Sequence, residues 1–314
     1  MFGLKGSYVY LDCRRCSSLS LTNPPPDYSP FYPNNYYSFS LPASDVPTEP
    51  HGLVRRFIWR KRNEAQILAR GGFWGLIARI RPRPDLEPVR RHFRGTTVFR
   101  SGYRLLDVGC GNAAWLRSLA SYGLRGLHGV EPFARNANQS STPLQIHHCR
   151  VHDLPRDLSF DLVLLSHSLE HDPEPRQVIG AIGKRLVPGG SCVVRIPIAG
   201  NAIWRRHRSL WVELDAPRHI AIPSKHALVQ VAGESGLTLQ SLEWEETEFG
   251  FWATELYRKG LSLIDPATEQ VRRPPDYFLA QELEAFRSEA RRLNRAGEGG
   301  RARFVFAKTG SRRR

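Results

Sequence analysis

From Tyr103 onward, short apolar runs alternate with helical stretches, and this alternation constrains the fold of the 314-residue chain more than any other feature. Strands that alternate with helices need right-handed crossovers, which give a parallel sheet covered by helices on both faces. We therefore predict an α/β domain with a doubly wound, mostly parallel, seven-stranded sheet. Its strands are expected at residues 105–108, 126–130, 144–148, 161–166, 192–196, 237–244 and 302–308.

The rest of the chain divides by composition. Residues 1–50 are rich in proline, which predicts an irregular extended arm. Residues 53–80 carry apolar side chains at helical spacing, interrupted by glycines, within a basic helical segment. We expect domains at 1–50, 51–100 and 101–314. Within the last, helices are predicted at 113–122, 134–138 and 174–186 with a turn at 188–190, a lid at 198–222 and a helical insertion at 250–300.

A glycine turn follows the first predicted strand and carries the clearest chemical signal. Gly109 and Gly111 open a helix directly after the strand, so a ligand can approach the backbone closely there. Glu131 ends the next strand, 22 residues after Gly109, where a carboxylate can accept both hydroxyls of a ribose. Asp107 precedes the turn, and a carboxylate there repels a pyrophosphate but suits a cationic ligand. The pattern therefore favours S-adenosylmethionine over a dinucleotide.

The segment from Leu105 to Asn112 resembles the first motif of class I S-adenosylmethionine-dependent methyltransferases. The resemblance covers roughly residues 100–245 and continues at residues 129–132, 153–155, 160–163, 168–171, 186–190 and 214–219. It implies a Rossmann-like methyltransferase fold, in a branch often associated with polysaccharide or natural-product pathways. It also implies the cofactor-binding residues, which are Asp107, Gly109, Cys110, Gly111, Glu131, Asp153, Leu154, Ser166 and His167.

Methyl transfer to a hydroxyl needs a base, and histidine is the usual one near neutral pH. His219 follows Asp215 by four residues, and a carboxylate that orients an imidazole is a common base arrangement. His171 is the second candidate. The alternative is structural, with His171 capping a helix and His219 holding a lid in place. Glu170 and His171 also resemble part of a metal-binding set in some ubiquinone-pathway O-methyltransferases, but a full ligand set is not evident and no metal is expected.

Five cysteines are too few and too scattered for a disulfide framework. Cys13 and Cys16 have zinc-knuckle spacing, yet they supply only two of the four ligands of a structural zinc. They resemble the second half of a small zinc ribbon, so a decayed ribbon and a misassigned start codon are both open interpretations. No apolar run approaches the roughly 20 residues that span a bilayer, and the start lacks a signal-peptide pattern. We therefore expect a cytoplasmic protein.

Charge is distributed unevenly along the chain, which has 45 basic and 30 acidic residues. Residues 51–104 hold 14 basic and three acidic residues, and residues 287–314 hold ten and two, so the motif-bearing remainder is slightly acidic. This disfavours a nucleic-acid acceptor, whose phosphates need basic side chains near the site. We expect O-methylation of a small molecule, sugar or glycan precursor. The alternatives are an RNA or DNA methyltransferase that uses the basic flanks, and a non-catalytic S-adenosylmethionine-binding protein.

Residues 53–80 mix aromatic and basic side chains, as interfacial helices do. Peripheral contact with an anionic membrane is one interpretation. The other is a helix packed over the cofactor domain with a solvated basic face. The sequence leaves the oligomeric state undetermined.

Overall fold

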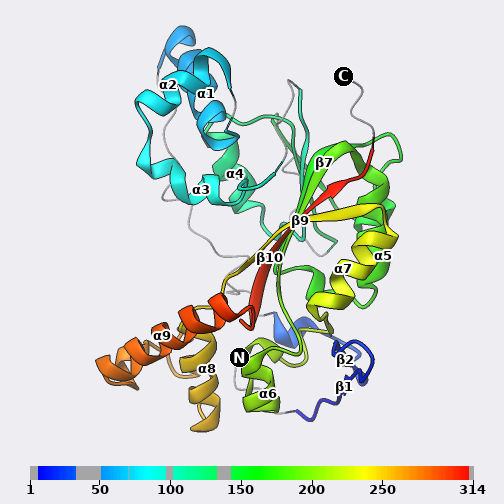
Figure 1. Ribbon diagram of the computed structural model, residues 1–314, viewed down its shortest axis with the longest axis vertical. Coiled ribbons are helices and arrows are strands. Elements are labelled where there is room, and N and C mark those ends of the chain that lie inside the picture. Colours follow the sequence, from blue (N-terminus) through cyan, green and yellow to red (C-terminus); the bar gives the residue numbers. More distant parts are fainter. Residues whose placement is uncertain (1–5, 33–50, 70, 97–101, 133–142, 311–314) are drawn as a thin grey trace.

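The computed structural model describes residues 6–32, 51–69, 71–96, 102–132 and 143–310. Its centre is a seven-stranded sheet of order β5-β4-β3-β6-β7-β10-β9 (Figure 1). Only β10 runs antiparallel to its neighbours in this sheet, so the predicted doubly wound, mostly parallel architecture is confirmed. The strands are β3 (Leu105–Val108), β4 (Leu127–Val130), β5 (Leu144–His147), β6 (Phe160–Ser166), β7 (Leu186–Pro197), β9 (Leu237–Trp244) and β10 (Arg301–Lys308).

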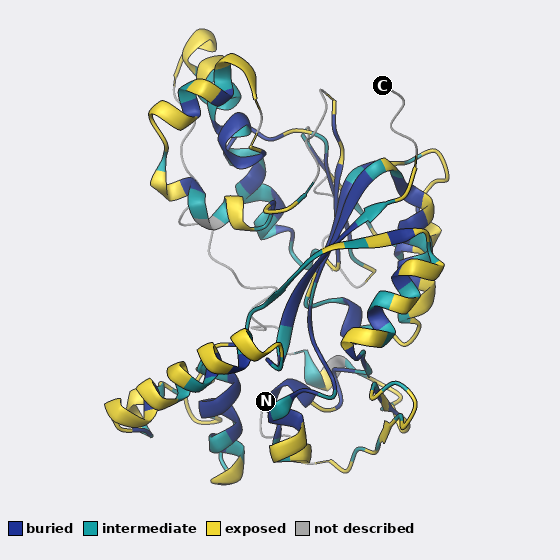
Figure 2. Cartoon of the chain, in the orientation of Figure 1, coloured by how far each residue is buried: buried dark blue, intermediate teal, exposed yellow. Residues whose placement is uncertain are grey.

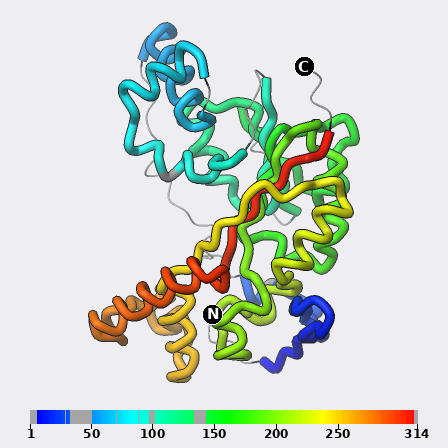
Figure 3. The backbone as a smooth tube through the Cα atoms, viewed as in Figure 1, coloured from blue at the N-terminus to red at the C-terminus, as the bar shows by residue number. Residues whose placement is uncertain are grey.

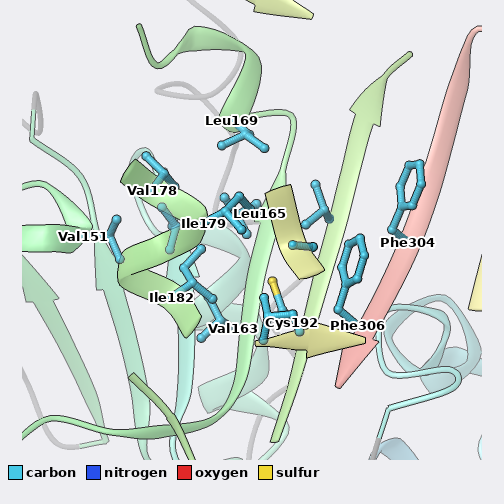
Figure 4. Close-up of a cluster of buried hydrophobic side chains, with 14 of the residues drawn as sticks. Val151, Val163, Leu165, Leu169, Val178, Ile179, Ile182, Cys192, Phe304 and Phe306 are labelled. Carbon is cyan, nitrogen blue, oxygen red and sulfur yellow. The ribbon is translucent and has the colours of Figure 1, made fainter. Parts of the chain in front are cut away.

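Helices cover both faces of the sheet because successive strand residues point to opposite sides. Leu106 belongs to a core shared with α5 and α7, whereas its neighbour Leu105 belongs to a second core with α1 and α4. Figure 4 shows the first core, where helical Ile179 and Ile182 pack toward the strands. The helices are α1 (Leu53–Ile67), α2 (Gly72–Ile80), α3 (Glu87–Arg91), α4 (Ala114–Ser121), α5 (Pro175–Arg185) and α7 (Lys225–Glu234).

The parallel strands end in register at one edge of the sheet. Val108 of β3 lies opposite Val130 of β4 on one side and Leu165 of β6 on the other. The residues that follow these strands, Gly109 and Glu131 among them, therefore meet at the carboxyl edge. This is the edge at which open α/β sheets bind ligands.

Two predicted details differ in the structure. The helix expected at 174–186 ends at Arg185, and residues 188–190, expected as a turn, belong to the long strand β7, which begins at Leu186. Gly189 keeps a left-handed φ of 76° within it, so the chain bends without leaving the sheet. The helix expected at 134–138 lies outside the described residues.

The N-terminal arm contains a hairpin that the sequence analysis did not predict. Strands β1 (Tyr10–Asp12) and β2 (Leu19–Leu21) pair with each other, and β2 pairs with β8 (Ala221–Ile222) in a second, three-stranded sheet. The Tyr10 hydroxyl donates a hydrogen bond to the carbonyl of His219, 2.7 Å away. The hairpin therefore packs against the segment that was predicted as a lid.

That segment is part of a third hydrophobic core rather than a loose loop. Trp211 has no solvent exposure and lies in a cluster with Leu19 and Leu293. Figure 3 shows the C-terminal helices extending from this end of the sheet. The elements here are α6 (Ala202–His207), η6 (Arg208–Leu210), η7 (Val212–Leu214), α8 (Phe249–Arg258) and α9 (Ala280–Ala296).

Residues 53–80 of the basic helical segment form two helices, α1 and α2, and the second begins at Gly72. Gly72 takes a φ of 75°, a conformation that favours glycine, and α2 ends shortly before Pro82. No helix in the described part of the chain combines the length and apolar character needed to cross a bilayer.

Candidate active site

The glycine turn after β3 forms a cradle that side chains would fill. Gly109 has a φ of 78°, and a Cβ atom placed on it would lie 2.5 Å from the Cβ atom of Ser168. Only glycine is therefore tolerated without a shift of the backbone. The side chain of Asn112 accepts a hydrogen bond from the amide of Ala114 at 2.9 Å and satisfies one of the free donors that open α4.

Two carboxylates converge on this turn. Oε2 of Glu131 accepts a hydrogen bond from the amide of Gly111 at 3.1 Å. Asp107 is buried, and burial together with the nearby charge of Glu131 raises its pKa to about 7. The pair creates a negative potential that suits the ammonium and sulfonium charges of S-adenosylmethionine and disfavours a pyrophosphate. The residues present therefore fit this cofactor.

The other residues assigned to the cofactor lie in different surroundings. The Cys110 side chain packs toward Gly129, because a Cβ atom on that glycine would lie 2.5 Å from the Cys110 sulfur. Asp153 is exposed at the end of η4 (Val151–Asp153), whereas Leu154 belongs to the hydrophobic core. The adenine-flanking roles of these two residues stay predictions.

Ser166 ends β6 at the carboxyl edge, and His167 follows it in a left-handed conformation with a φ of 52°. This φ is uncommon for a residue with a side chain and occurs most often where a site requires it. The amide of His167 donates a hydrogen bond to the carbonyl of Arg195 at 2.9 Å, which holds the turn on β7. Nδ1 of His167 lies 3.4 Å from Oε1 of Glu170.

Glu170 and His167 form an ion pair of unequal exposure. Glu170 has no solvent exposure, and neither of its oxygens accepts a well-aligned hydrogen bond from the described residues. Burial alone would lower the pKa of His167, but the adjacent Glu170 carboxylate outweighs it and raises that pKa above its usual value. Burial alone would raise the pKa of Glu170, but the adjacent His167 outweighs burial and lowers that pKa below its usual value. The pair therefore stabilises the charged forms of both residues.

The predicted catalytic residues lie in a buried network behind this pair. Nδ1 of His219 lies 2.6 Å from the carbonyl of Glu213, and Nδ1 of His171 lies 2.9 Å from the carbonyl of Arg218. The two imidazole rings meet edge to face at 4.9 Å. Because a carbonyl only accepts hydrogen bonds, both Nδ1 atoms carry the proton. Burial and the nearby His171 lower the pKa of His219 to about 4.

Asp215 completes this network without forming a close pair with His219. Its carboxylate accepts a hydrogen bond from the guanidinium of Arg218, and the Nε2 atom of His219 is 3.8 Å away. Burial raises the pKa of Asp215, but the charge of Arg218 outweighs burial and lowers it below its usual value. Asp215 is therefore paired with Arg218 rather than with His219.

Glu170, His171 and His219 also have the side-chain types that ligate metals, with one atom of each within 4.8 Å of the others. The anionic charges of this network are already offset, Glu170 by His167 and Asp215 by Arg218. Buried charges that are paired in this way do not need a divalent ion for neutrality.

A cavity of about 300 Å³ lies at the same edge of the sheet. His167 lines it from the end of β6, Arg195 from β7, and Glu245 from the residue after β9. A larger cavity of about 520 Å³ includes Arg104 and Gly126, which precede β3 and β4. That cavity is therefore at the amino edge, away from the glycine turn, and we take the smaller one as part of the active site.

Sequence reasoning missed most of the residues around this cavity. Arg195 lies inside the apolar run predicted as a strand, and a charge in a buried strand was a usable signal. Glu245 follows a predicted strand directly, and Arg301 precedes one. Glu170 was seen only as part of a motif, although it follows His167 by three residues. What the sequence does not reveal is that two distant strands meet at this point.

The model of the methyltransferase domain family matches residues 76–242, about half of the chain. The chain belongs to this family. It is a class I S-adenosylmethionine-dependent methyltransferase by fold and motifs, and S-adenosylmethionine is its cofactor, as the resemblance implied.

Curated relatives of this methyltransferase include two named ubiquinone biosynthesis O-methyltransferase. The protein from Marinobacter nauticus is 30% identical over an alignment of 135 residues, and the match covers 39% of this chain and 56% of the relative. The protein from Xanthomonas oryzae pv. oryzae is 31% identical over an alignment of 134 residues, and the match covers 38% of this chain and 53% of the relative. The chain thus spans about half the length of these relatives.

Solved structures with a similar fold include a SAM-dependent methyltransferase from Archaeoglobus fulgidus. It has a TM-score of 0.43 and 16% identity, and the match covers 72% of this chain and 91% of that one. Phosphoethanolamine N-methyltransferase 2 from Haemonchus contortus, in complex with S-adenosyl-L-methionine, also has a TM-score of 0.43 and 16% identity. This match covers 70% of this chain and 52% of that one.

Proposed function

We propose that this methyltransferase transfers a methyl group to a hydroxyl oxygen of a small molecule, with sugars and glycan precursors included. The observation that supports this most is the His167–Glu170 pair, which lines a cavity at the edge that carries the glycine turn. A hydroxyl acceptor needs a base to remove its proton, whereas an amine acceptor depends on a base less strictly. The curated relatives that are named O-methyltransferases agree with an oxygen acceptor.

S-adenosylmethionine supplies the electrophilic methyl group when it is bound at the glycine turn. His167 takes the proton of the acceptor hydroxyl through Nε2, because its Nδ1 faces the Glu170 carboxylate and carries the other proton. Glu170 fixes the ring and stabilises the imidazolium that forms, as a carboxylate does in a catalytic triad. The wall around the cavity aligns the acceptor and excludes water.

Asp215, His171 and His219 have a supporting role in this proposal. His219 is a weak base because its pKa is low, and its Nδ1 is engaged by a backbone carbonyl. His171 and His219 lie within 4.8 Å of Glu170, and Asp215 is paired with Arg218 in the same network, whose balanced charges need no metal ion. They are therefore proposed as positioning residues.

We also propose that the exposed face of α1 and α2 contacts an anionic membrane. Large apolar side chains on these helices are exposed, among them Leu53 at 85% and Phe73 at 69% (Figure 2). The edge-to-face contact of Phe57 with Trp74 at 6.2 Å joins the two helices into one surface. This surface, called the α1–α2 patch below, comprises Leu53, Val54, Phe57, Ile58, Phe73, Leu76 and Ile80.

Charge around the α1–α2 patch supports a lipid rather than a protein partner. Arg55 and Arg79 are exposed on the same two helices, and the described residues of both helices hold six basic side chains against one acidic. Apolar side chains flanked by cations suit the boundary between acyl chains and anionic headgroups. The end of α1 packs on the domain through Ile67, and this face of the helix stays exposed.

The acceptor proposal is tested with purified protein, labelled S-adenosylmethionine and fractionated cell extract. Release of S-adenosylhomocysteine together with label in metabolites or glycan precursors is expected, and His167→Gln should lower this rate at least a hundredfold with cofactor binding kept. Label in RNA or DNA would overturn the proposal. Cofactor binding without any transfer would favour a non-catalytic protein.

A further inference from the structure

The cavity beside His167 has a lining unlike that of most small-molecule pockets. Such pockets are predominantly apolar with a few polar groups. Here six of the eight lining residues are polar or charged, and only Ile196 and Ala302 are apolar. The polar ones are His167, Arg195, Glu245, Glu246, Thr247 and Arg301. An acceptor in this cavity must therefore offer hydrogen bonds on several sides.

The two arginines of the lining already have carboxylate partners, Arg195 in Glu245 within the lining and Arg301 in Glu213 beside it. Nε of Arg195 donates a hydrogen bond to Glu245 at 2.8 Å. Arg301 donates to the Thr247 hydroxyl at 2.7 Å and lies 3.3 Å from the buried carboxylate of Glu213. An anionic acceptor would have to displace these carboxylates, and a cationic one would have to displace the arginines. The pairing therefore selects a ligand without net charge.

Glu246 adds a buried acceptor of hydrogen bonds at a fixed place. Its two oxygens accept hydrogen bonds from the amides of Thr247 and Gly300, at 2.9 and 2.8 Å. Each carboxylate oxygen accepts more than one hydrogen bond, so the held group keeps capacity toward the cavity. Burial raises the pKa of Glu246. The backbone holds the side chain still, as a site that recognises a specific hydroxyl requires.

We propose that this cavity is the acceptor site and that the acceptor is a neutral, polyhydroxylated molecule of the sugar type. The inference rests on the proposed O-methyl transfer. Each sugar hydroxyl donates to one carboxylate and accepts from one guanidinium, so it can be inserted between existing pairs without leaving a charge unpaired. The volume of about 300 Å³ lies at the lower end of ligand pockets and suits one sugar unit.

An apolar phenol fits the same cavity poorly. It would cover Arg195, Glu245 and Glu246 while offering them few hydrogen bonds. Burying polar groups without partners is costly, and charged groups are the most costly. The lining therefore disfavours an acceptor that is mainly hydrocarbon.

The class of the acceptor is tested by partition. The full-length protein is incubated with methyl-labelled S-adenosylmethionine and a total metabolite extract. Label is then separated into an organic phase, an aqueous phase retained on an anion exchanger and an aqueous neutral phase. We expect label in the neutral phase. Boronate resin should bind the labelled molecule, or glycosidase treatment should release the label as a monosaccharide. Label mainly in the organic or anionic phase would overturn the sugar assignment and leave methyl transfer intact. No label in any phase, with cofactor bound, would overturn the proposed function as well.

A matched pair of variants tests the location. Glu245→Gln should raise the half-saturating amount of the neutral fraction about tenfold, with the Kd for S-adenosylmethionine unchanged by calorimetry. Glu248→Gln, three residues along and paired with Arg287 on the surface, should change neither value. If the two variants behave alike while the label still enters the neutral phase, the acceptor binds elsewhere. A loss of cofactor affinity in Glu245→Gln would assign that residue to the cofactor instead.

Discussion

Nδ1 of His167 lies 3.4 Å from Oε1 of Glu170, and the carboxylate of that pair is completely buried. A buried carboxylate holds its charge only if a cation or several donors face it. In the proposed mechanism the imidazole of His167 is neutral before the reaction, with Nδ1 facing the carboxylate, and it becomes the cation that faces Glu170 when it takes the acceptor proton. The pair thus favours the protonated form of His167 and sets the pH above which the neutral base is available for transfer.

Glu170→Gln removes the carboxylate that raises the pKa of His167. The base acts only when it is neutral, so wild-type activity should fall as the pH drops through a pKa above the usual 6.5. In the variant this acidic limb of kcat/KM should move to lower pH, and kcat should fall about tenfold or more because the imidazolium loses its counter-charge. Glu234→Gln, on an exposed pair, is the control. An unchanged acidic limb would rule out the pairing as the source of the pH dependence.

The raised pKa of Asp107 predicts that binding of the cofactor releases a proton. Its pKa is raised to about 7, so below pH 7 it is largely protonated in the free protein. The ammonium of S-adenosylmethionine favours the carboxylate and lowers that pKa, so binding releases a proton and affinity rises from pH 5.5 to 7. Calorimetry in buffers with different ionisation enthalpies measures the release. Asp107→Asn should weaken binding about tenfold and abolish this proton release. Equal affinity of the wild type at both pH values would contradict the coupling.

The sequence was sufficient for the sheet and the cofactor edge because both depend on local patterns. Apolar runs of four to eight residues mark buried strands, and the Gly109 turn marks the place where a ligand meets a helix. It was not sufficient for the acceptor side. Arg195 and Glu245 are 50 residues apart in the sequence, and they meet because β7 and β9 both pair with β10 and end at the same edge of the sheet. The hairpin at residues 10–21 was missed because its three-residue strands carry too short a pattern.

Chelation should leave the activity unchanged. The carboxylates near His171 and His219 are paired with His167 and Arg218, so the network is neutral without an ion. Transfer rates measured after dialysis against EDTA should agree with the untreated enzyme within about twofold. Loss of activity that added Mg²⁺ or Zn²⁺ restores would show that Glu170, His171 and His219 bind a metal, and would overturn this prediction.

Asp215→Asn tests whether the network supports the fold. Asp215 and Arg218 are both buried, so the substitution takes the carboxylate partner from a buried guanidinium and should lower the free energy of unfolding by about 3–5 kcal/mol. Glu234→Gln breaks an exposed pair with Arg176 and should cost about 1 kcal/mol or less. Urea unfolding of both variants gives the comparison. Equal losses would mean that the buried pair contributes no more than a surface one.

The α1–α2 patch predicts binding to vesicles that depends on both charge and apolar contact. The protein should float with vesicles that contain phosphatidylglycerol and remain at the bottom with neutral phosphatidylcholine, because exposed arginines attract anionic headgroups. Phe57→Glu places a charge in the patch and should reduce flotation at least fivefold. Val271→Glu, on a valine of similar exposure outside the patch, should float like the wild type. If Phe57→Glu floats normally, the patch does not bind lipid. If the protein instead sediments as a dimer that Phe57→Glu dissociates, the patch covers a second copy.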